Sequence, residues 1–157
     1  MTKVYEHKAR KDYPQFGIAK GDTYYEWAFF RQKPTKSKTY PTRIQLTQND
    51  TQIAVWSVYD QCGIDWSERN AATLAEAVND AASQLEEAAS ECREKFDNMP
   101  EGLQQGDTGQ RLEQWADAID SAVSELQDLA SEIENADEDI DFAAFEEQFG
   151  ATEPDLS

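Results

Sequence analysis

The sequence has very few of the residues that usually carry catalysis. It contains one histidine, His7, and two cysteines, Cys62 and Cys92, among 157 residues. A histidine base usually needs an orienting partner and a nucleophile nearby, and no motif around His7 supplies them. Phosphate-binding loops, dinucleotide-binding glycine patterns, zinc-protease motifs and nucleophile elbows are all missing. The sequence therefore predicts a protein that is not an enzyme and that uses neither a cofactor nor a metal.

Long apolar runs are also missing. A membrane-spanning helix needs roughly 18 or more consecutive apolar residues, and no stretch of this chain approaches that length. Residues 1–7 lack the apolar region of a signal peptide. The two cysteines fall on different predicted elements without CxxC spacing, as expected of reduced thiols. We therefore expect a cytoplasmic protein that does not associate with a membrane.

Basic residues are scarce after residue 45. Residues 1–45 carry ten Lys/Arg and four Asp/Glu, a net charge of +6, whereas residues 46–157 carry four Lys/Arg and 28 Asp/Glu, a net charge of −24. This asymmetry predicts a basic partner for the acidic part, an anionic partner for the basic part, or attraction between the two. Adaptation to high salt is an alternative, because an acidic, lysine-poor surface also keeps a protein soluble.

Two stretches show apolar residues at alternating steps of three and four, which is the heptad pattern of packed helices. The first stretch contains Leu74, Val78, Ala81, Leu85, Ala88 and Cys92, and it continues to Phe96 or Lys95 and then Met99. The second contains Leu112, Trp115, Ile119, Ala122, Leu126, Leu129, Ile133 and Ala136. Between them, residues 97–109 hold one proline and three glycines, which exclude a continuous helix. Residues 65–136 are therefore predicted to form a long antiparallel helical hairpin.

Residues 3–46 have the composition of a small β-unit. Aromatic residues crowd residues 23–31, which favours a strand. Two further strands are predicted over residues 4–9 and 38–46, with a polar loop over residues 32–37.

A sheet of three short strands cannot cover both of its faces, so we expect a helix to pack on it. Residues 48–62 provide that helix, because they lie between an N-terminal capping signal and the helix-ending Gly63. The side chains expected to face the sheet are Ile53, Val55, Trp56 and Tyr59.

The acidic residues 137–157 carry apolar side chains that an exposed linker does not need. Phe142, Phe145 and Phe149 follow one another at the spacing of one helix face. We expect these rings to dock, either in a groove of a partner protein or on the chain's own β-unit. Docking on the β-unit is the preferred interpretation, because the two segments have complementary charge.

Together these features predict an α+β protein in three parts. Residues 1–64 form the basic, aromatic β-unit with its covering helix. Residues 65–136 form the helical hairpin, which is of coiled-coil type, and residues 137–157 form the acidic tail. The oligomeric state is left open, with a dimer through the helices as one arrangement.

Several motifs resemble those of a family of small uncharacterised proteins that are common in phages and prophages. Four of them are ARKDYP from Ala9, GIAKGDTYY from Gly17, SKTYP from Ser37 and QLT from Gln45. A fifth, DNMPEGLQQGDTG from Asp97, resembles the family's helix–helix loop. The resemblance covers about residues 3–134. It implies an origin in a phage or mobile element, and so the host cytoplasm as location, but no particular activity.

The acidic helices predict an interaction function. A helix rises 1.5 Å per residue, so a helix of about 28 residues spans roughly 40 Å. Two such helices with about 20 carboxylates approach, without matching, the charge density of DNA, about one charge per 1.7 Å. The leading hypothesis is a non-enzymatic phage-type protein whose acidic, DNA-mimicking arm inhibits a basic host defence or DNA-binding protein. Its candidate contact residues are Glu87, Glu94, Glu113, Asp117 and Asp128.

The basic residues 1–45 support a second hypothesis, a nucleic-acid-binding module. Cations that neutralise phosphates alternate there with rings that can stack on bases. The candidate residues are Arg10, Lys11, Lys20, Tyr24, Trp27, Arg31, Lys36 and Lys38. In the simpler interpretation, the rings form a core and the cations solubilise the unit or pair with the acidic hairpin. A third hypothesis is a structural protein that dimerises through its coiled coil.

Overall fold

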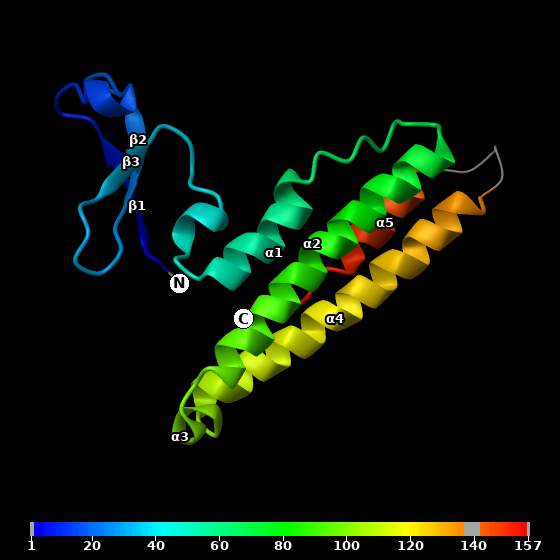
Figure 1. Ribbon diagram of the computed structural model, residues 1–157. Coiled ribbons are helices and arrows are strands. Elements are labelled where there is room, and N and C mark those ends of the chain that lie inside the picture. The colour runs from blue at the N-terminus through cyan, green and yellow to red at the C-terminus, as the bar shows by residue number, and fades with distance from the viewer. Residues whose placement is uncertain (1, 137–141, 157) are drawn as a thin grey trace. The chain divides into compact units, whose positions relative to one another are not determined.

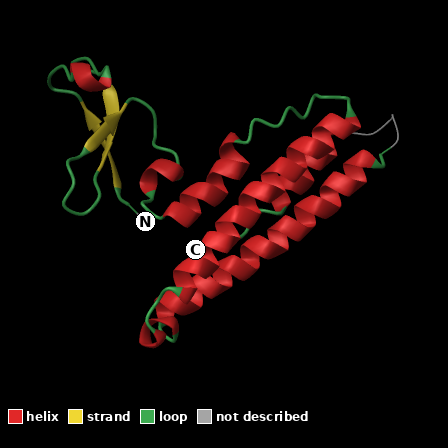
Figure 2. Ribbon diagram, viewed as in Figure 1, coloured by secondary structure: helices red, strands yellow, loops and turns green. Residues whose placement is uncertain are grey.

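The chain divides between Asn49 and Asp50 into two compact units. A computed structural model describes residues 2–136 and 142–156. Its units are Met1–Asn49 and Asp50–Ser157, which we call the N-terminal unit and the helical unit. The strands lie in the N-terminal unit and the α-helices in the helical unit (Figure 2), so the prediction of an α+β protein is confirmed.

The N-terminal unit is built on a three-stranded antiparallel sheet in the order β1-β2-β3. The strands are β1 (Val4–Lys8), β2 (Thr23–Trp27) and β3 (Thr35–Ser37). A 3-10 helix, Pro14–Phe16, lies between β1 and β2. Its core consists of the buried residues Ala9, Ile18 and Tyr24, with Tyr13 and Phe16 packed against them.

The third strand lies where the sequence predicted a loop. Residues 38–46, the predicted strand, contain only the 3-10 helix Ile44–Leu46. Pro41 lacks the N–H that a strand ladder needs, whereas Lys36 on β3 lies opposite Glu26 on β2 and pairs with its carboxylate. The cross-strand ion pair therefore favours the earlier segment as β3.

The helical unit is organised around two long helices that lie side by side (Figure 1). They are α2 (Ala71–Asp97) and α4 (Asp107–Glu134), and the short helix α3 (Glu101–Gln104) connects them. Helix α2 begins after Asn70, whose side-chain oxygen accepts hydrogen bonds from the backbone N–H groups of Ala72 and Thr73, at 3.1 and 3.3 Å. The heptad residues Leu74 to Cys92 and Trp115 to Ile133 are buried, as the hairpin prediction requires.

Helix α1 (Asp50–Gln61) packs against α2, so the prediction that it covers the sheet is wrong. Val55 and Val58 are buried in the same core as the hairpin, and the Cys92 thiol lies 3.4 Å from the Thr51 hydroxyl. The long hairpin offers more apolar surface than a three-stranded sheet, and burial free energy scales with that area. The division of the chain therefore falls after residue 49 instead of residue 64.

The C-terminal segment also packs on the helical unit. Helix α5 (Phe142–Ala151) lies along α4, and Phe145 and Phe149 are buried. The Phe149 ring lies 5.2 Å from the ring of Tyr59 and 5.3 Å from that of Trp66. The tail thus docks within its own chain, but on helices and not on the predicted β-unit. Residues 137–141 of the predicted tail lie outside the described residues.

Candidate functional site

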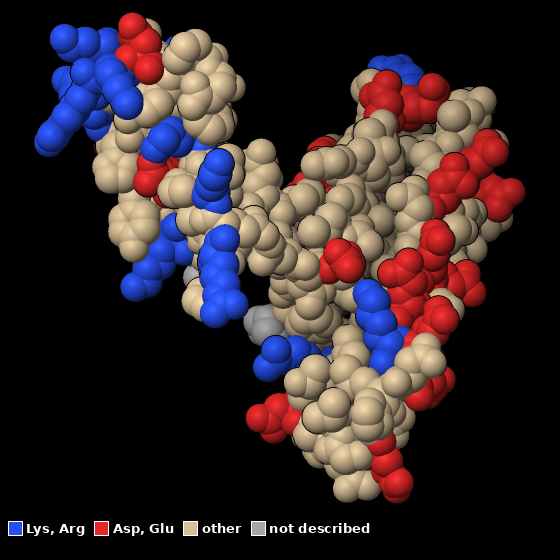
Figure 3. Space-filling model, turned by 60° about the vertical axis from the view of Figure 1, so that its left-hand side comes forward, with Lys and Arg blue, Asp and Glu red and all other residues tan. Residues whose placement is uncertain are grey.

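The hairpin helices α2 and α4 carry a large excess of exposed carboxylates, and we call them the acidic hairpin. Their acidic residues are Glu76, Asp80, Glu86, Glu87, Glu91, Glu94, Asp97, Asp107, Glu113, Asp117, Asp120, Glu125, Asp128, Glu132 and Glu134. All of them are exposed except Asp120, which is half-buried. The only cations on these two helices are Arg93, Lys95 and Arg111. Figure 3 shows the red Asp and Glu side chains spread along the helical unit.

This charge is about half as dense as that of DNA. Fifteen carboxylates and three cations leave a net charge of −12. Spread over a helix length of roughly 40 Å, that is roughly 0.3 charges per Å, compared with roughly 0.6 for duplex DNA. The five predicted contact residues Glu87, Glu94, Glu113, Asp117 and Asp128 are all exposed. The arrangement can attract a cationic surface, although it does not reproduce the charge of a duplex.

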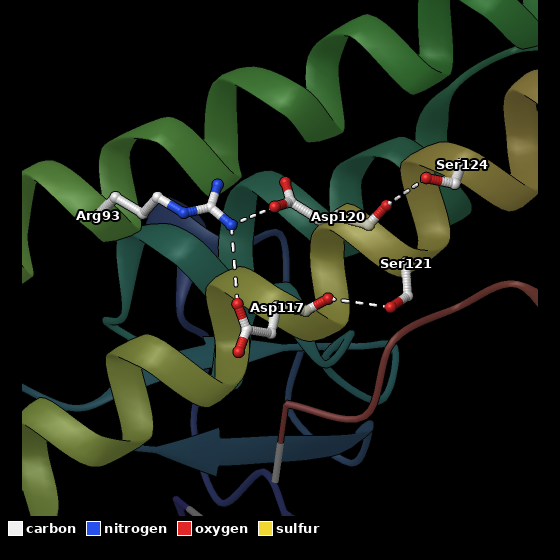
Figure 4. A network of polar contacts seen from close by, with 5 residues as sticks. All are labelled: Arg93, Asp117, Asp120, Ser121 and Ser124. Atoms are coloured by element: carbon white, nitrogen blue, oxygen red, sulfur yellow. Dashed lines mark hydrogen bonds and ion pairs between the residues drawn. The ribbon is translucent and has the colours of Figure 1, made fainter.

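One arginine bridges the two helices of the acidic hairpin. Arg93 on α2 pairs with the Asp120 carboxylate on α4, and its Nη2 lies 3.7 Å from Oδ1 of Asp117 (Figure 4). The hydrogen bond with Asp120 raises the pKa of Arg93, so the guanidinium stays charged. The Ser121 and Ser124 hydroxyls donate to the backbone carbonyls of Asp117 and Asp120, both at 3.1 Å. Because its carboxylate lies near Arg93, Asp117 helps to hold the two helices together as well as being a candidate contact residue.

A shallow hollow of about 680 Å³ opens beside the end of α2 that leads into α3. Its lining residues are Asp50, Glu91, Glu94, Lys95, Asn98, Met99 and Leu112. Lys95 offsets part of the charge, because its Nζ lies 3.7 Å from Oε2 of Glu91. The hollow could receive the aliphatic stem and charged end of a lysine or arginine. Sequence reasoning selected Glu94 but missed Asp50, because α1 was expected on the sheet.

The tail does not offer its rings to a partner in this arrangement. Phe145 and Phe149 are 7% and 4% exposed, and Phe142 is half-buried with its ring 6.3 Å from that of Phe145. Phe145 and Phe149 are therefore covered by the chain itself, whereas Phe142 keeps part of its surface open. The Tyr59 hydroxyl lies 3.1 Å from the Thr152 hydroxyl, which holds the end of the segment in place.

Two of the predicted nucleic-acid contacts are buried in the N-terminal unit. Tyr24 and Trp27 have little exposed area, so neither ring can accept a base. The ammonium of Lys36 pairs with Glu26 and lies 5.1 and 5.0 Å from the ring centres of Tyr13 and Tyr24. These three side chains support the fold instead of facing a ligand.

The other predicted cations remain at the surface. Lys38 Nζ lies 2.8 Å from Oδ2 of Asp22 and holds the pKa of that carboxyl below its ordinary value, with help from the Ala19 backbone N–H. Arg10, Lys11, Lys20 and Arg31 are exposed as well. The Arg31 guanidinium lies 5.1 Å from the Phe30 ring, at the far end of β2.

Sequence reasoning missed two exposed rings on β1, Tyr5 and His7. His7 was weighed as a catalytic base and rejected in that role, and Tyr5 was not selected. Their spacing of two residues on a predicted strand was a usable signal, because alternate residues share one face.

Other kinds of site are not supported among the described residues. In residues 2–136 and 142–156, no three His, Cys, Asp or Glu side chains are placed so that they could hold a metal ion. None of the helices in the same part of the chain combines the length and apolar character that crossing a bilayer requires. Comparison of the chain with protein-family models, curated proteins and solved structures finds no match.

Proposed function

We propose that this is a binding protein whose acidic hairpin engages a basic surface of another protein. The observation that carries the proposal is the exposure of fourteen of the fifteen hairpin carboxylates, with three cations to offset them. Exposed charges of one sign attract a complementary surface and speed association with it. In concrete form, the protein occupies the cationic groove of a host defence or DNA-binding protein, in keeping with the phage-like motifs of the sequence.

The packing of the hairpin favours this use. The heptad residues from Leu74 to Cys92 and from Trp115 to Ile133, which we call the seam, are buried between the two helices, and Arg93 pairs with Asp120 across the surface. A rigid scaffold loses little conformational freedom on binding, so more of the interaction energy appears as affinity. A dimer through the heptad seam is less well supported, because these residues are already buried within one chain.

The test is binding by a variant with fewer carboxylates. The substitutions Glu87→Gln, Glu94→Gln, Glu113→Gln and Asp128→Asn remove charge at exposed positions without touching the seam. A basic protein captured from host lysate by the full chain should bind the variant about tenfold more weakly, because each lost charge removes attraction. Its affinity for the unchanged protein should fall as salt rises, and duplex DNA should compete with it.

Two double variants, each lacking two carboxylates, test whether binding depends on where the charge lies or only on how much charge there is. Glu94→Gln with Glu113→Gln removes two charges from the acidic hairpin, and Glu146→Gln with Glu147→Gln removes two from the exposed side of α5. The hairpin pair should weaken binding more than the α5 pair. The proposal is overturned if binding is independent of salt, if the two pairs behave alike, or if the fourfold variant keeps full affinity.

A further inference from the structure

One face of the N-terminal sheet carries a row of aromatic rings. Opposite residues of an antiparallel ladder share a face, and the register pairs Tyr5 with Glu26 and His7 with Tyr24. The Tyr5 and His7 ring centres lie 6.4 Å apart at an interplanar angle of 28°. The row continues from His7 to Tyr24 over 5.4 Å and from Tyr24 to Tyr13 over 5.7 Å. We call this surface the ring face.

The fold covers the inner rings and leaves the outer ones open. Tyr24 is buried in the core of the unit and Tyr13 is half-buried beside it. Tyr5 is 56% exposed, and His7 is exposed as well. The ring face therefore presents two uncovered rings on a base of packed ones.

The charges around the ring face favour an anionic ligand. Lys11 Nζ lies 5.6 Å from the Tyr13 ring centre, next to the row. The carboxylates of the N-terminal unit are each occupied or turned away. Glu26 pairs with Lys36, Asp22 with Lys38, and Asp12 accepts a hydrogen bond from the Lys20 backbone N–H at 2.6 Å. Glu6 alternates with Tyr5 and His7 on β1, so it lies on the opposite face.

From these observations we infer that the ring face binds single-stranded nucleic acid, with Tyr5 and His7 stacking on two bases and Lys11 contacting a phosphate. Rings can stack on bases only when the bases are unpaired. The 6.4 Å between Tyr5 and His7 is nearly twice the roughly 3.4 Å step of a stacked duplex strand. It suits a strand whose bases are spread apart. This activity is separate from the proposed function of the acidic hairpin.

The acidic helical unit limits the strength of this binding. Its net charge of −24 repels phosphates, and screening confines that repulsion to about 8 Å at physiological ionic strength.

The test is fluorescence anisotropy of labelled oligo-dT and oligo-rU with the full chain. Tyr5→Thr and His7→Thr should each weaken binding about tenfold, since loss of one stacked base corresponds to about one factor of ten. Threonine is chosen because it lacks a ring but favours strands. Lys11→Gln should make the affinity less dependent on salt.

The chain offers a matched control in Tyr40. This tyrosine is 62% exposed, and its ring lies 5.3 Å from that of Tyr25, which is on the opposite face of the sheet from Tyr24. Tyr40→Thr should leave the affinity unchanged. Amide NMR shifts of β2 report whether each variant keeps its sheet. Tyr5→Leu, which retains apolar cover without an aromatic ring, replaces Tyr5→Thr if those shifts are lost.

Four results would overturn the inference. They are no binding of either oligonucleotide, equal loss in the Tyr5 and Tyr40 variants, equal affinity for a duplex of the same length, and binding to anionic lipid vesicles in place of oligonucleotides. None of the variants alters the acidic hairpin, so failure here leaves the proposed protein-binding function standing.

Discussion

At the scale of single residues, Gly109 in the first turn of α4 leaves room for the chain that precedes it. A Cβ atom at this position would lie 2.2 Å from the backbone oxygen of Gln104, closer than real atoms approach. The backbone of α3 cannot move aside as a flexible side chain could. The connection between α3 and α4 therefore requires glycine, which has no side chain, at position 109.

Gly109→Ala should consequently destabilise the helical unit by about 1–3 kcal/mol, the usual cost of overpacking. Gly102→Ala is the control, because nothing lies within 4 Å of its Cβ position and alanine has the higher helix propensity. The two variants should shift the midpoint of urea unfolding, followed by circular dichroism, in opposite directions. If both variants shift the unfolding midpoint equally, the backbone near Gly109 accommodates a methyl group without loss of stability.

Leu85 and Leu126 test the packing of the seam at the same scale. Both side chains have 0% exposure, and Leu103 at the hairpin connection is 57% exposed. Leu85→Ala and Leu126→Ala should each cost about 2–5 kcal/mol in unfolding free energy. Leu103→Ala should change it by less than about 0.5 kcal/mol. The seam prediction fails if all three variants have similar stability.

These residues also show what the sequence could predict. Every residue of the two heptad series from Leu74 to Cys92 and from Trp115 to Ile133 is buried, because a spacing of three and four places side chains on one helix face whatever they pack against. The clash at Gly109 was not predictable, since it depends on the path of a connection that periodicity does not describe. The spacing of Tyr5 and His7 on a predicted strand indicates that they share one face, but it does not show that this face is left uncovered.

At the scale of elements, α1 and α5 share one side of the hairpin core. Tyr59 on α1 donates its hydroxyl hydrogen to the backbone oxygen of Thr152 after α5, over 3.2 Å. Burial raises the pKa of Tyr59 to about 12, with the Thr152 hydroxyl acting against the shift and the Glu153 carboxylate adding to it. The neutral phenol is thus the form that the folded unit favours.

A raised pKa in the folded state makes stability fall on the alkaline side. The contribution of Tyr59 is complete below the ordinary tyrosine pKa of about 10 and is lost as the pH rises through about 12. Since the side chain is only half-buried, the expected loss is on the order of 1–2 kcal/mol. Urea unfolding of the full chain at several alkaline pH values measures it.

Tyr59→Phe is the control for that measurement, because it keeps the ring against Phe149 and removes the ionisable group. Its stability should vary less with pH between about 10 and 12 than that of the unchanged protein. The helical unit contains one lysine, Lys95, so few other side chains titrate in this range. An identical pH dependence in both proteins would contradict the assignment to Tyr59.

The sequence predicted where the helices lie better than it predicted what they pack against. The existence of the helix over residues 48–62 was predicted nearly to its ends, but its packing partner was not. Apolar side chains on one helix face must be buried, but their pattern does not show which surface of the protein will bury them. The same reason explains the tail, whose three phenylalanines were expected to dock and were assigned to the wrong unit.

At the scale of the whole molecule, the helical unit is held together against its own charge. Its net charge of −24 lies on a unit with only four cations. Self-repulsion of this kind destabilises a compact state, and added salt weakens it. The melting temperature followed by the helical circular dichroism signal should therefore rise from low to moderate sodium chloride.

The fourfold carboxylate variant is the control for this effect. It should melt at a higher temperature than the unchanged protein in low salt, and the difference should shrink as salt is added. A melting temperature that falls with salt would mean that attractive ion pairs such as Arg93–Asp120 outweigh repulsion among the remaining carboxylates. The prediction that the acidic helices bind a basic partner rests on charges that can be counted in the sequence. The sequence also shows how that charge divides along the chain, and the fold moves the boundary of the N-terminal unit from residue 64 to residue 49.

The small residues of the seam also decide how this chain can change over generations. Ala81, Ala82, Ala88 and Ala89 on α2 are buried, as are Ala116, Ala122 and Ala130 on α4. A single-base change in an alanine codon yields valine, threonine, serine, glycine, proline, aspartate or glutamate. Each of these adds bulk, adds a polar group or weakens the helix at a site that tolerates none of the three. Packing sets no such limit on the exposed carboxylates, so the buried alanines constrain the chain even where nothing binds to its surface.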